Sequence, residues 1–454
     1  MKSARKCELG EWEARTTFVL ALAAAAVSLG NFWRFAYLAG SNGGGAFIVT
    51  YLACLFLVAV PLLIAEVVIG SAGRANPVDA IGWTSAQSRL SRGWLALGAV
   101  ACLTGLVILS CLTVVAGWSL AYAYYLQSGV FSAASAGLVG SEFDAHLRDP
   151  MRQLFWQTGF LAVAGVAVAM GVRRGLGVLV WLLVPVMISL LLLLGRFAFE
   201  YGDMAATREF LFSIKLVDFS SRSILLALGH ALLTLGTGVG AAICFGAYAP
   251  RRIPIGRSVV AVAVFDSLIA LQAGLIVFPL VFANNLEPTM GPGLLFVSLP
   301  YAFGNVPQGE WFGALFFILV ALASLGSAVA MMEPTVGALI QRLRIARPYA
   351  VVLLLMAVWA AGLAVARSFS MDSVPGWYVN GNLLEFLDQL AAGLLLPLVS
   401  LLTVIYVGWR LRPDLLRSQL DREADFSFSL WRLLLRYVTP VIILGAMATE
   451  FIQV

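Results

Sequence analysis

Apolar runs long enough to cross a membrane recur along the whole chain and are separated by short polar segments. A membrane-spanning helix needs about 20 apolar residues. By this criterion the pattern predicts about eleven spans, at 13–38, 42–70, 93–126, 154–171, 175–197, 222–248, 258–284, 308–341, 348–368, 382–409 and 431–453. The expected fold class is therefore an all-α integral membrane protein.

Two of these spans contain glycine and polar residues where an unbroken helix would be expected. The first span reads SLGN at 28–31, and the sixth reads LTLGTGVGA at 233–241. Each glycine costs about 1 kcal/mol relative to alanine in a helix, although small residues can also serve close helix packing. Backbone that leaves a helix inside a membrane must line protein or water. Both segments are candidates for a site at mid-membrane.

The two interruptions fall in spans one and six, the same place in two successive blocks of five spans. This placement is typical of inverted-repeat transporters. The predicted fold is therefore a five-plus-five inverted repeat with discontinuous spans 1 and 6, plus an eleventh span. The predicted segments are a cytoplasmic N-terminal segment (1–12), a first repeat (13–197), an extracellular loop (198–221), a second repeat (222–409), a cytoplasmic loop (410–430) and the eleventh span (431–454).

Composition and charge support a membrane protein and argue against soluble-enzyme chemistry. The chain is 61% hydrophobic and 12% charged, and its net charge is +5. The arginines collect in alternate loops, which predicts a cytoplasmic N-terminus and makes the charge a topology signal. We expect membrane lipid around the protein and no nucleic-acid partner. Five cysteines and two histidines show no metal or nucleophile motif, so no enzyme activity is expected.

Several motifs together resemble one known family. They are LGNFWRF (29–35), SNGGGAF (41–47), PLLIAEVVIG (61–70), VVAGWSLAY (114–122), LTLGTGVGA (233–241), DSLIALQAGLIVFP (266–279) and MMEP (331–334). The chain resembles the neurotransmitter:sodium symporter family, and within it the bacterial amino-acid transporter branch with eleven spans and a leucine-transporter-like fold. The resemblance implies a sodium-coupled symporter that imports a small amino acid or amine-like solute by alternating access. It also implies a monomer or weak homo-oligomer in the bacterial inner membrane.

The resemblance implies a first sodium site made by the Ala26 carbonyl, the Asn31 side chain, Thr234 and Asp266. All of these are oxygen donors, which suit a hard cation. Asp266 occupies a position that is often asparagine in the family. A fixed carboxylate would supply the negative charge that chloride-dependent relatives take from an anion, so we expect sodium dependence without chloride.

A second sodium site is implied at the carbonyls of Ala24, Val27 and Ala323, with hydroxyls from two adjacent residues of the eighth span. Those adjacent positions read Gly326 and Ser327, so one hydroxyl is absent. A water, or the hydroxyl of a neighbouring serine, could replace it. We expect this site to be weakened, and its loss remains an alternative.

The implied substrate site is more aliphatic than is usual in the family. Leu112 stands where a tyrosine usually binds the substrate carboxylate, and Leu233 stands in place of an aromatic lid. The implied walls are Ala25, Ala26, Gly30, Ile108, Leu112, Leu233, Thr234, Gly236, Thr237, Val239, Ser327 and Met331. An amino acid or a related small carboxylate is expected, and its identity stays open.

The resemblance also implies gates on both sides of this site. Arg34 is expected to pair with Asp388 at the outer gate, and Trp12 and Tyr248 to form inner packing contacts. An inner arginine–aspartate pair of the family is replaced here by Leu9 and Gln341. A weaker inner latch would raise the inward-open population.

Two further polar residues lie within predicted spans. Glu66 is expected to accept hydrogen bonds from amides that the sixth span frees. His230 precedes Thr234 by one helical turn and thus shares its face; it is either a neutral, hydrogen-bonded histidine or a proton-coupling group. The alternatives for the whole protein are therefore a proton-driven or single-sodium relative, or a sensor that binds substrate without transporting it.

Overall fold

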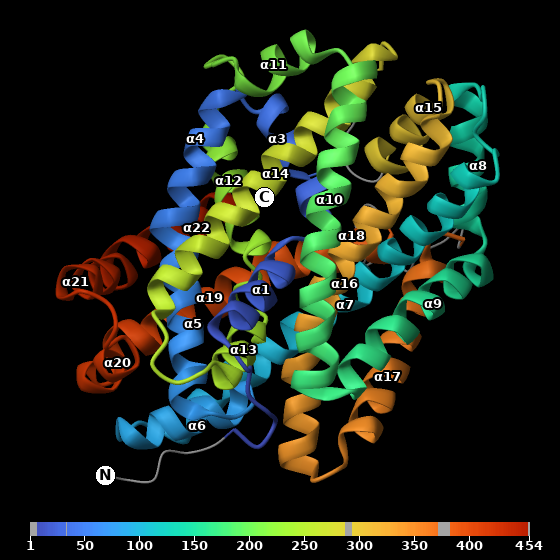
Figure 1. Cartoon of the computed structure of the whole chain (residues 1–454). Coiled ribbons are helices and arrows are strands. Elements are labelled where there is room, and N and C mark those ends of the chain that lie inside the picture. The colour runs from blue at the N-terminus through green and yellow to red at the C-terminus, as the bar shows by residue number, and fades with distance from the viewer. Residues whose placement is uncertain (1–6, 33, 287–292, 371–381, 453–454) are drawn as a thin grey trace.

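The computed structural model describes residues 7–32, 34–286, 293–370 and 382–452. Within these ranges the regular structure is helical, and the one isolated β-bridge joins Gly44 to Ile214. Figure 1 shows long helices running side by side between two ends of the molecule. One end carries α8 (Ala136–Arg148), α11 (Met204–Phe212) and α15 (Leu299–Gly304), and the other carries α6 (Pro77–Gln87).

Eight helical stretches of the described residues are long and apolar enough to cross a membrane. They are Gly45–Gly73 (with α4, Gly45–Cys54, and α5, Val60–Gly73), Arg92–Gln127 (with α7, Leu95–Gln127), Val172–Tyr201 (with α10, Val178–Tyr201), Ile255–Ala283 (α14), Gly309–Leu343 (α16), Arg347–Ser368 (α17), Leu383–Arg410 (with α18, Leu383–Gln389, and α19, Leu396–Ile405) and Asp425–Gly445 (with α21, Asp425–Leu433, and the start of α22, Thr439–Ile452). The helix α9 (Pro150–Ala169) and two interrupted segments account for the other expected spans, while the short α20 (Pro413–Gln419) lies in the loop before the last one.

The first interruption separates α1 (Arg15–Ala26) from α2 (Leu29–Phe32), which α3 (Arg34–Ser41) follows. Val27 leaves the helical conformation, with φ −66° and ψ 114°. The chain re-enters a helix at once because Asn31 Oδ1 accepts a hydrogen bond of 3.1 Å from the Ser28 amide. A side chain thus satisfies one of the backbone donors that a helix start leaves open. The predicted break in span one is confirmed.

The second interruption separates α12 (Ser221–Thr234) from α13 (Ala241–Tyr248). Gly236, Gly238 and Gly240 take φ values of +61°, +82° and +76°. These values lie in the left-handed region, which glycine adopts without the steric cost that a Cβ imposes. The alternating glycines therefore make the break, as the sequence predicted, rather than only a packing surface.

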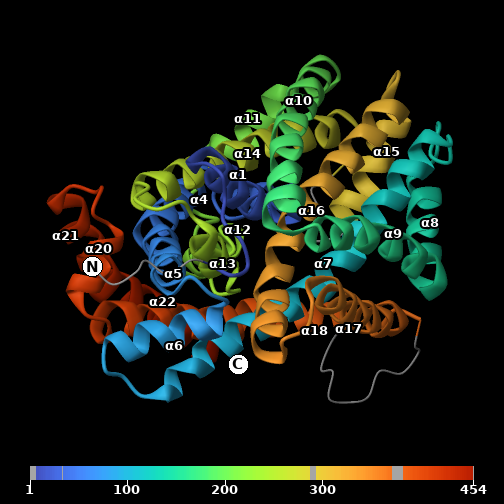
Figure 2. The same ribbon diagram turned by 60° about the horizontal axis from the view of Figure 1, so that its bottom comes forward.

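The interrupted helices lie in the middle of the molecule (Figure 1, Figure 2). α1 packs against α14 and α16, and α13 packs against α5. The contact between α13 and α5 is very close, because a Cβ placed on Gly70 would lie 1.8 Å from the Ile243 carbonyl oxygen. The broken segments are thus enclosed by protein, as backbone with open polar groups requires inside a membrane.

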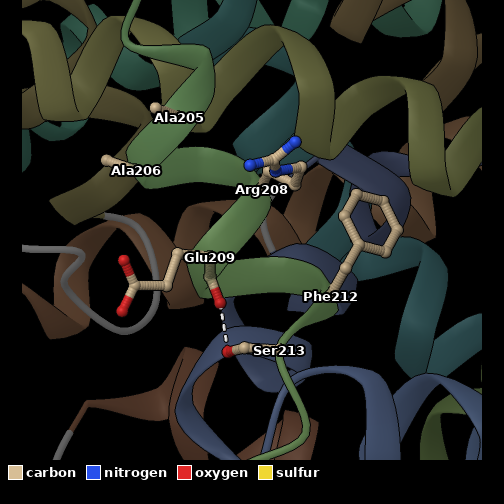
Figure 3. A pocket seen from close by; sticks show the side chains of 6 residues that line it. All are labelled: Ala205, Ala206, Arg208, Glu209, Phe212 and Ser213. Atoms are coloured by element: carbon tan, nitrogen blue, oxygen red, sulfur yellow. Dashed lines mark hydrogen bonds between the residues drawn. The ribbon is translucent and has the colours of Figure 1, made fainter.

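The loop that follows α11 packs against the glycines at 43–45. The Gly45 amide donates to the Ser213 carbonyl at 3.0 Å, and a Cβ on Gly44 would lie 2.2 Å from that same oxygen. A surface hollow of about 620 Å³ lies beside this loop and is lined by Ala205, Ala206, Arg208, Glu209, Phe212 and Ser213 (Figure 3). None of these residues belongs to the interrupted helices, so the hollow is separate from the predicted site.

Candidate ion and substrate site

A fully buried carboxylate joins the two interrupted segments. Asp266, on α14, has no exposed surface. Its Oδ1 accepts a 2.8 Å hydrogen bond from Asn31 Nδ2, and its Oδ2 accepts a 2.8 Å hydrogen bond from Thr234 Oγ1. Asn31 belongs to α2, just after the first break, and Thr234 is the last residue of α12, just before the second. Three of the four residues expected at the first sodium site are therefore in direct contact.

The fourth, Ala26, is the buried last residue of α1. An ionised carboxylate in the membrane interior is costly unless it is hydrogen-bonded and its charge is balanced. Asn31 and Thr234 supply hydrogen bonds, but both side chains are neutral. Their oxygens and those of Asp266 form a hard donor set that fits a monovalent cation.

Glu66 supports the second break. Its Oε1 accepts a 2.7 Å hydrogen bond from the Gly238 amide, a donor that left-handed backbone frees from the helix. Glu66 is buried on α5, while Gly238 lies between α12 and α13. The contact has the form that the sequence predicted, with an acid of span two facing the unwound part of span six.

The expected second cation position has a different arrangement. Ser327 Oγ donates to carbonyl oxygens at the end of α1, at 3.0 Å from Ala25 and 3.1 Å from Val27. The Ala24 carbonyl lies over Gly326, where a Cβ would approach it to 2.2 Å. Ala323 is fully buried in the same part of α16. The residues named from the sequence therefore meet, but they bond to one another directly.

A small cavity lies between α1, α13 and α16. It is lined by Leu22, Ala25, Leu235, Gly236, Val239, Ala241, Ala242, Phe245, Ser327, Ala330 and Met331. Its walls include five of the predicted substrate residues, namely Ala25, Gly236, Val239, Ser327 and Met331. The sequence did not predict the others, because small and apolar residues in an apolar helix carry no distinguishing signal.

The remaining predicted wall residues do not line this cavity. They are Ala26, Gly30, Ile108, Leu112, Leu233, Thr234 and Thr237. Thr237 is turned toward its own chain, since its hydroxyl donates to the Leu232 carbonyl at 2.9 Å. Thr234 is engaged with Asp266. The enclosed space is thus displaced along α13 from the predicted pocket.

An ion pair lies at the end of the site that is expected to face outward. Arg34 Nη1 lies 3.8 Å from Asp388 Oδ2, and their side chains are 27% and 56% exposed. A pair with this exposure is screened by water and holds weakly. The contact suits a gate that must open and close.

An aromatic and ionic cluster lies at the end of the site that is expected to face inward, and it includes two residues that were not predicted there. Trp12 packs edge-on to Tyr248 at 5.9 Å, and its amide donates to the Tyr248 carbonyl at 2.8 Å. The Tyr248 hydroxyl donates to Glu333 Oε2 at 2.7 Å, and Arg347 pairs with Glu333 Oε1. Glu333 was visible in the MMEP motif, but nothing in the sequence placed Arg347 beside it.

Leu9 and Gln341 lie at the same end of the site. Leu9 lies against Gly337 of α16, and Gln341 Oε1 accepts hydrogen bonds from the Asn76 amide and side chain at 2.9 and 2.8 Å. A weak inner latch was expected because the arginine–aspartate pair is lost, with Trp12 and Tyr248 as the remaining contacts. Leu9 and Gln341 make further contacts at this end of α16.

His230 is buried, and both of its ring nitrogens lack a hydrogen-bond partner among the described residues. Its ring stacks on Phe35, with centroids 5.5 Å apart, and lies against Tyr51. Its Cε1 lies 3.8 Å from where a Cβ of Gly30 would be. The hydrogen-bonded histidine considered from the sequence is therefore not found.

Two interrupted helices beside a buried carboxylate and an apolar cavity are typical of a membrane transporter. The family model of the sodium:neurotransmitter symporter family matches residues 9–133 and 150–454. The chain belongs to this family, as the motifs predicted. It is a multi-pass sodium-dependent symporter of that family and not an enzyme.

Known proteins agree with this assignment over nearly the whole chain. The chain is 29% identical to an uncharacterized sodium-dependent transporter of Bacillus subtilis, YhdH, over 96% of both chains. It is 25% identical to the sodium-dependent dopamine transporter of Bos taurus, over 95% of this chain and 68% of that protein. The crystal structure of MhsT in complex with L-phenylalanine matches with a TM-score of 0.87 and 31% identity, covering 99% of this chain and 100% of that one. The predicted fold class is thereby confirmed.

Proposed function

We propose that this protein imports a small amino acid or a related solute together with sodium, by alternating access across the bacterial inner membrane. Asp266 is the observation that carries the proposal, because a membrane-buried carboxylate without a basic partner in its hydrogen bonds calls for a cation. The positive-inside pattern supports a cytoplasmic N-terminus. The fixed charge of Asp266 also supports chloride independence.

Sodium would link the two breaks. A cation bound by Asn31, Thr234 and Asp266 would hold α2, α12 and α14 together. A ligand shifts a conformational equilibrium only by its differential affinity for the two states. Sodium would therefore favour the state in which these three helices meet, and the substrate would complete the cavity beside them.

An amino-acid substrate is supported by similarity to MhsT, whose structure contains L-phenylalanine. The cavity walls agree with an aliphatic or aromatic side chain, because residues such as Leu22, Val239 and Met331 line them. Leu112 and Leu233 remove polar and aromatic groups near the expected pocket. These replacements favour a hydrophobic amino acid over a polar one.

The test is uptake of radiolabelled L-phenylalanine and L-leucine into proteoliposomes. An inward sodium gradient should drive accumulation, and replacing external chloride with gluconate should leave the rate unchanged. Accumulation with a pH gradient alone would favour the proton-driven relative. Sodium-dependent binding without any uptake would favour the sensor, and no response of either kind would refute the proposal.

A further inference from the structure

The hydroxyl of Ser327 connects α16 to the point where α1 ends. Ser327 is 1% exposed, and its Oγ lies 3.0 Å from the Ala25 carbonyl oxygen and 3.1 Å from that of Val27. A hydroxyl has one proton, so these two carbonyls share a single donor. Both belong to backbone at the first break, where Val27 turns away from the helix.

Gly326 allows α1 to lie unusually close to α16. A Cβ on Gly326 would stand 2.2 Å from the Ala24 carbonyl oxygen, a distance that no side chain tolerates. The Ala24 carbonyl oxygen, an expected cation ligand, instead packs against the backbone of Gly326. Any residue other than glycine would require the two helices to separate.

The hydroxyls of the neighbouring serines are directed to groups other than the end of α1. Ser324 Oγ donates to the Val320 carbonyl of its own helix at 2.9 Å. Ser28 Oγ is directed to Asn31 Oδ1 at 3.5 Å. Both serines are therefore engaged elsewhere, and Ser327 is the hydroxyl that reaches the broken end of α1.

The surroundings of Ser327 differ in charge from those of Asp266. A cation beside Asp266 meets a full negative charge in a low-dielectric surrounding, where Coulomb attraction is strong. Around Ser327 the named groups are carbonyl dipoles and one hydroxyl, all neutral. A cation at the Ala25 and Val27 carbonyls would also have to compete with the Ser327 proton for their lone pairs.

We propose that Gly326 and Ser327 replace a second sodium ion with a direct bond between helices, so that each transport cycle carries one sodium, at Asp266. The inference rests on the proposed sodium-coupled function and specifies its coupling. Ser327 acts as a positioning residue that keeps the end of α1 on α16. At zero membrane potential, a tenfold sodium gradient would then support about tenfold substrate accumulation, rather than about a hundredfold with two ions.

Equilibrium binding of radioactive sodium to the purified full-length protein tests the inference without a known substrate. One sodium per chain is expected for the unaltered protein. Two per chain would overturn the inference while leaving the proposed function intact. No sodium binding at all would overturn the proposed function as well, so the two failures are distinguishable.

Three substitutions locate the bound ion. Ser327→Ala should still bind one sodium per chain, with a lower melting temperature because the two carbonyls lose their donor. Ser324→Ala is the matched control, since that hydroxyl bonds only within its own helix, and it should change neither quantity. Asp266→Asn should bind sodium at least about tenfold more weakly. A sodium ion that survives Asp266→Asn but disappears in Ser327→Ala would place the site at Ser327 and contradict the inference.

Discussion

The Asn31 side-chain amide lies 2.8 Å from Asp266 Oδ1, so the first interrupted helix is tied directly to α14 inside the membrane. Thr234 makes the matching bond from the second interrupted helix. A change in the charge of Asp266 therefore affects both interrupted helices. An ion bound at Asp266, as proposed, would therefore act on both interrupted helices.

Removing the charge of Asp266 should weaken sodium coupling. In Asp266→Asn a neutral amide faces Asn31 and Thr234, so the full negative charge that attracts a cation is lost. We expect the sodium concentration for half-maximal uptake to rise at least about tenfold, equivalent to about 1.4 kcal/mol. Sodium titration of uptake in proteoliposomes measures this change.

Ser267→Ala is the matched control for this substitution. Ser267 is the next residue on α14, and its hydroxyl donates to the Ala263 carbonyl of the same helix at 2.9 Å. Its sodium response should equal that of the unaltered protein. An unchanged sodium response in Asp266→Asn would exclude Asp266 as the ion-binding group.

Loss of the Glu66 acceptor should loosen the second break. Glu66→Ala leaves the buried Gly238 amide without a partner, at a cost of about 1–3 kcal/mol. Glu66→Gln keeps an oxygen for this amide and should retain most of the stability. Melting temperatures in detergent measure both variants; equal losses in Ala and Gln would show that the hydrogen bond to Gly238 is not what Glu66 contributes.

Arg347 should hold the inner side closed through Glu333. Arg347→Ala leaves the fully buried Glu333 without its cation, and breaking a buried pair in this way costs about 3–5 kcal/mol. Electron-spin distance measurements between labels at Glu13 and Leu343, both exposed near the inner ends of α1 and α16, should show a larger population of longer distances.

The double variant Glu333→Gln with Arg347→Ala separates the ion pair from the rest of the cluster. Glu333→Gln removes the buried charge that Arg347→Ala alone leaves unpaired. Part of the inward-closed population should therefore return. The same distances in all three proteins would mean that the ion pair does not contribute to inner closure.

A side chain at Gly326 should force α1 away from α16. Gly326→Ala places a Cβ 2.2 Å from the Ala24 carbonyl oxygen, and we expect a loss of about 1–3 kcal/mol from this overpacking. Gly159→Ala on α9 is the control, because nothing lies within 4 Å of its Cβ position. The two variants should differ clearly in melting temperature, and equal values would refute the close contact.

Acidification should loosen the outer helix α8 through His146. Burial, and then the nearby Arg152 guanidinium, lower the pKa of His146 from 6.5 to about 4. The folded protein therefore resists protonation that an unfolded segment accepts, so stability is full above about pH 6.5 and falls toward pH 4, by about 3 kcal/mol at most. His146→Asn cannot gain this charge. The melting-temperature difference between the two proteins should shift on going from pH 7 to pH 5, and a constant difference would contradict this role.

The sequence was most informative where backbone conformation depends on residue type. Alternating Gly236, Gly238 and Gly240 predicted a break because few other residues adopt their φ values, and the break is found there. Glu66 stood out because an acid is costly in an apolar span, whereas Asp266 was implied by the family resemblance. These signals are local to the chain.

Contacts between distant segments were not predictable in the same way. Arg347 was one of many basic loop residues, and only the packing of α17 beside α16 brings it to Glu333. The shift of the cavity toward Ala242 and Phe245 depends on how closely α1 and α13 approach α16. Gly326 allows α1 to approach α16, and its partner, the Ala24 carbonyl, lies far away in the chain.

The most direct test of the account is a crystal structure with thallium(I) in place of sodium, because this heavy monovalent ion marks its position by anomalous scattering. One anomalous peak is expected, bounded by Asn31, Thr234 and Asp266. A protein with no peak beside Asp266, or with its peak between Ser327 and the end of α1, would contradict it.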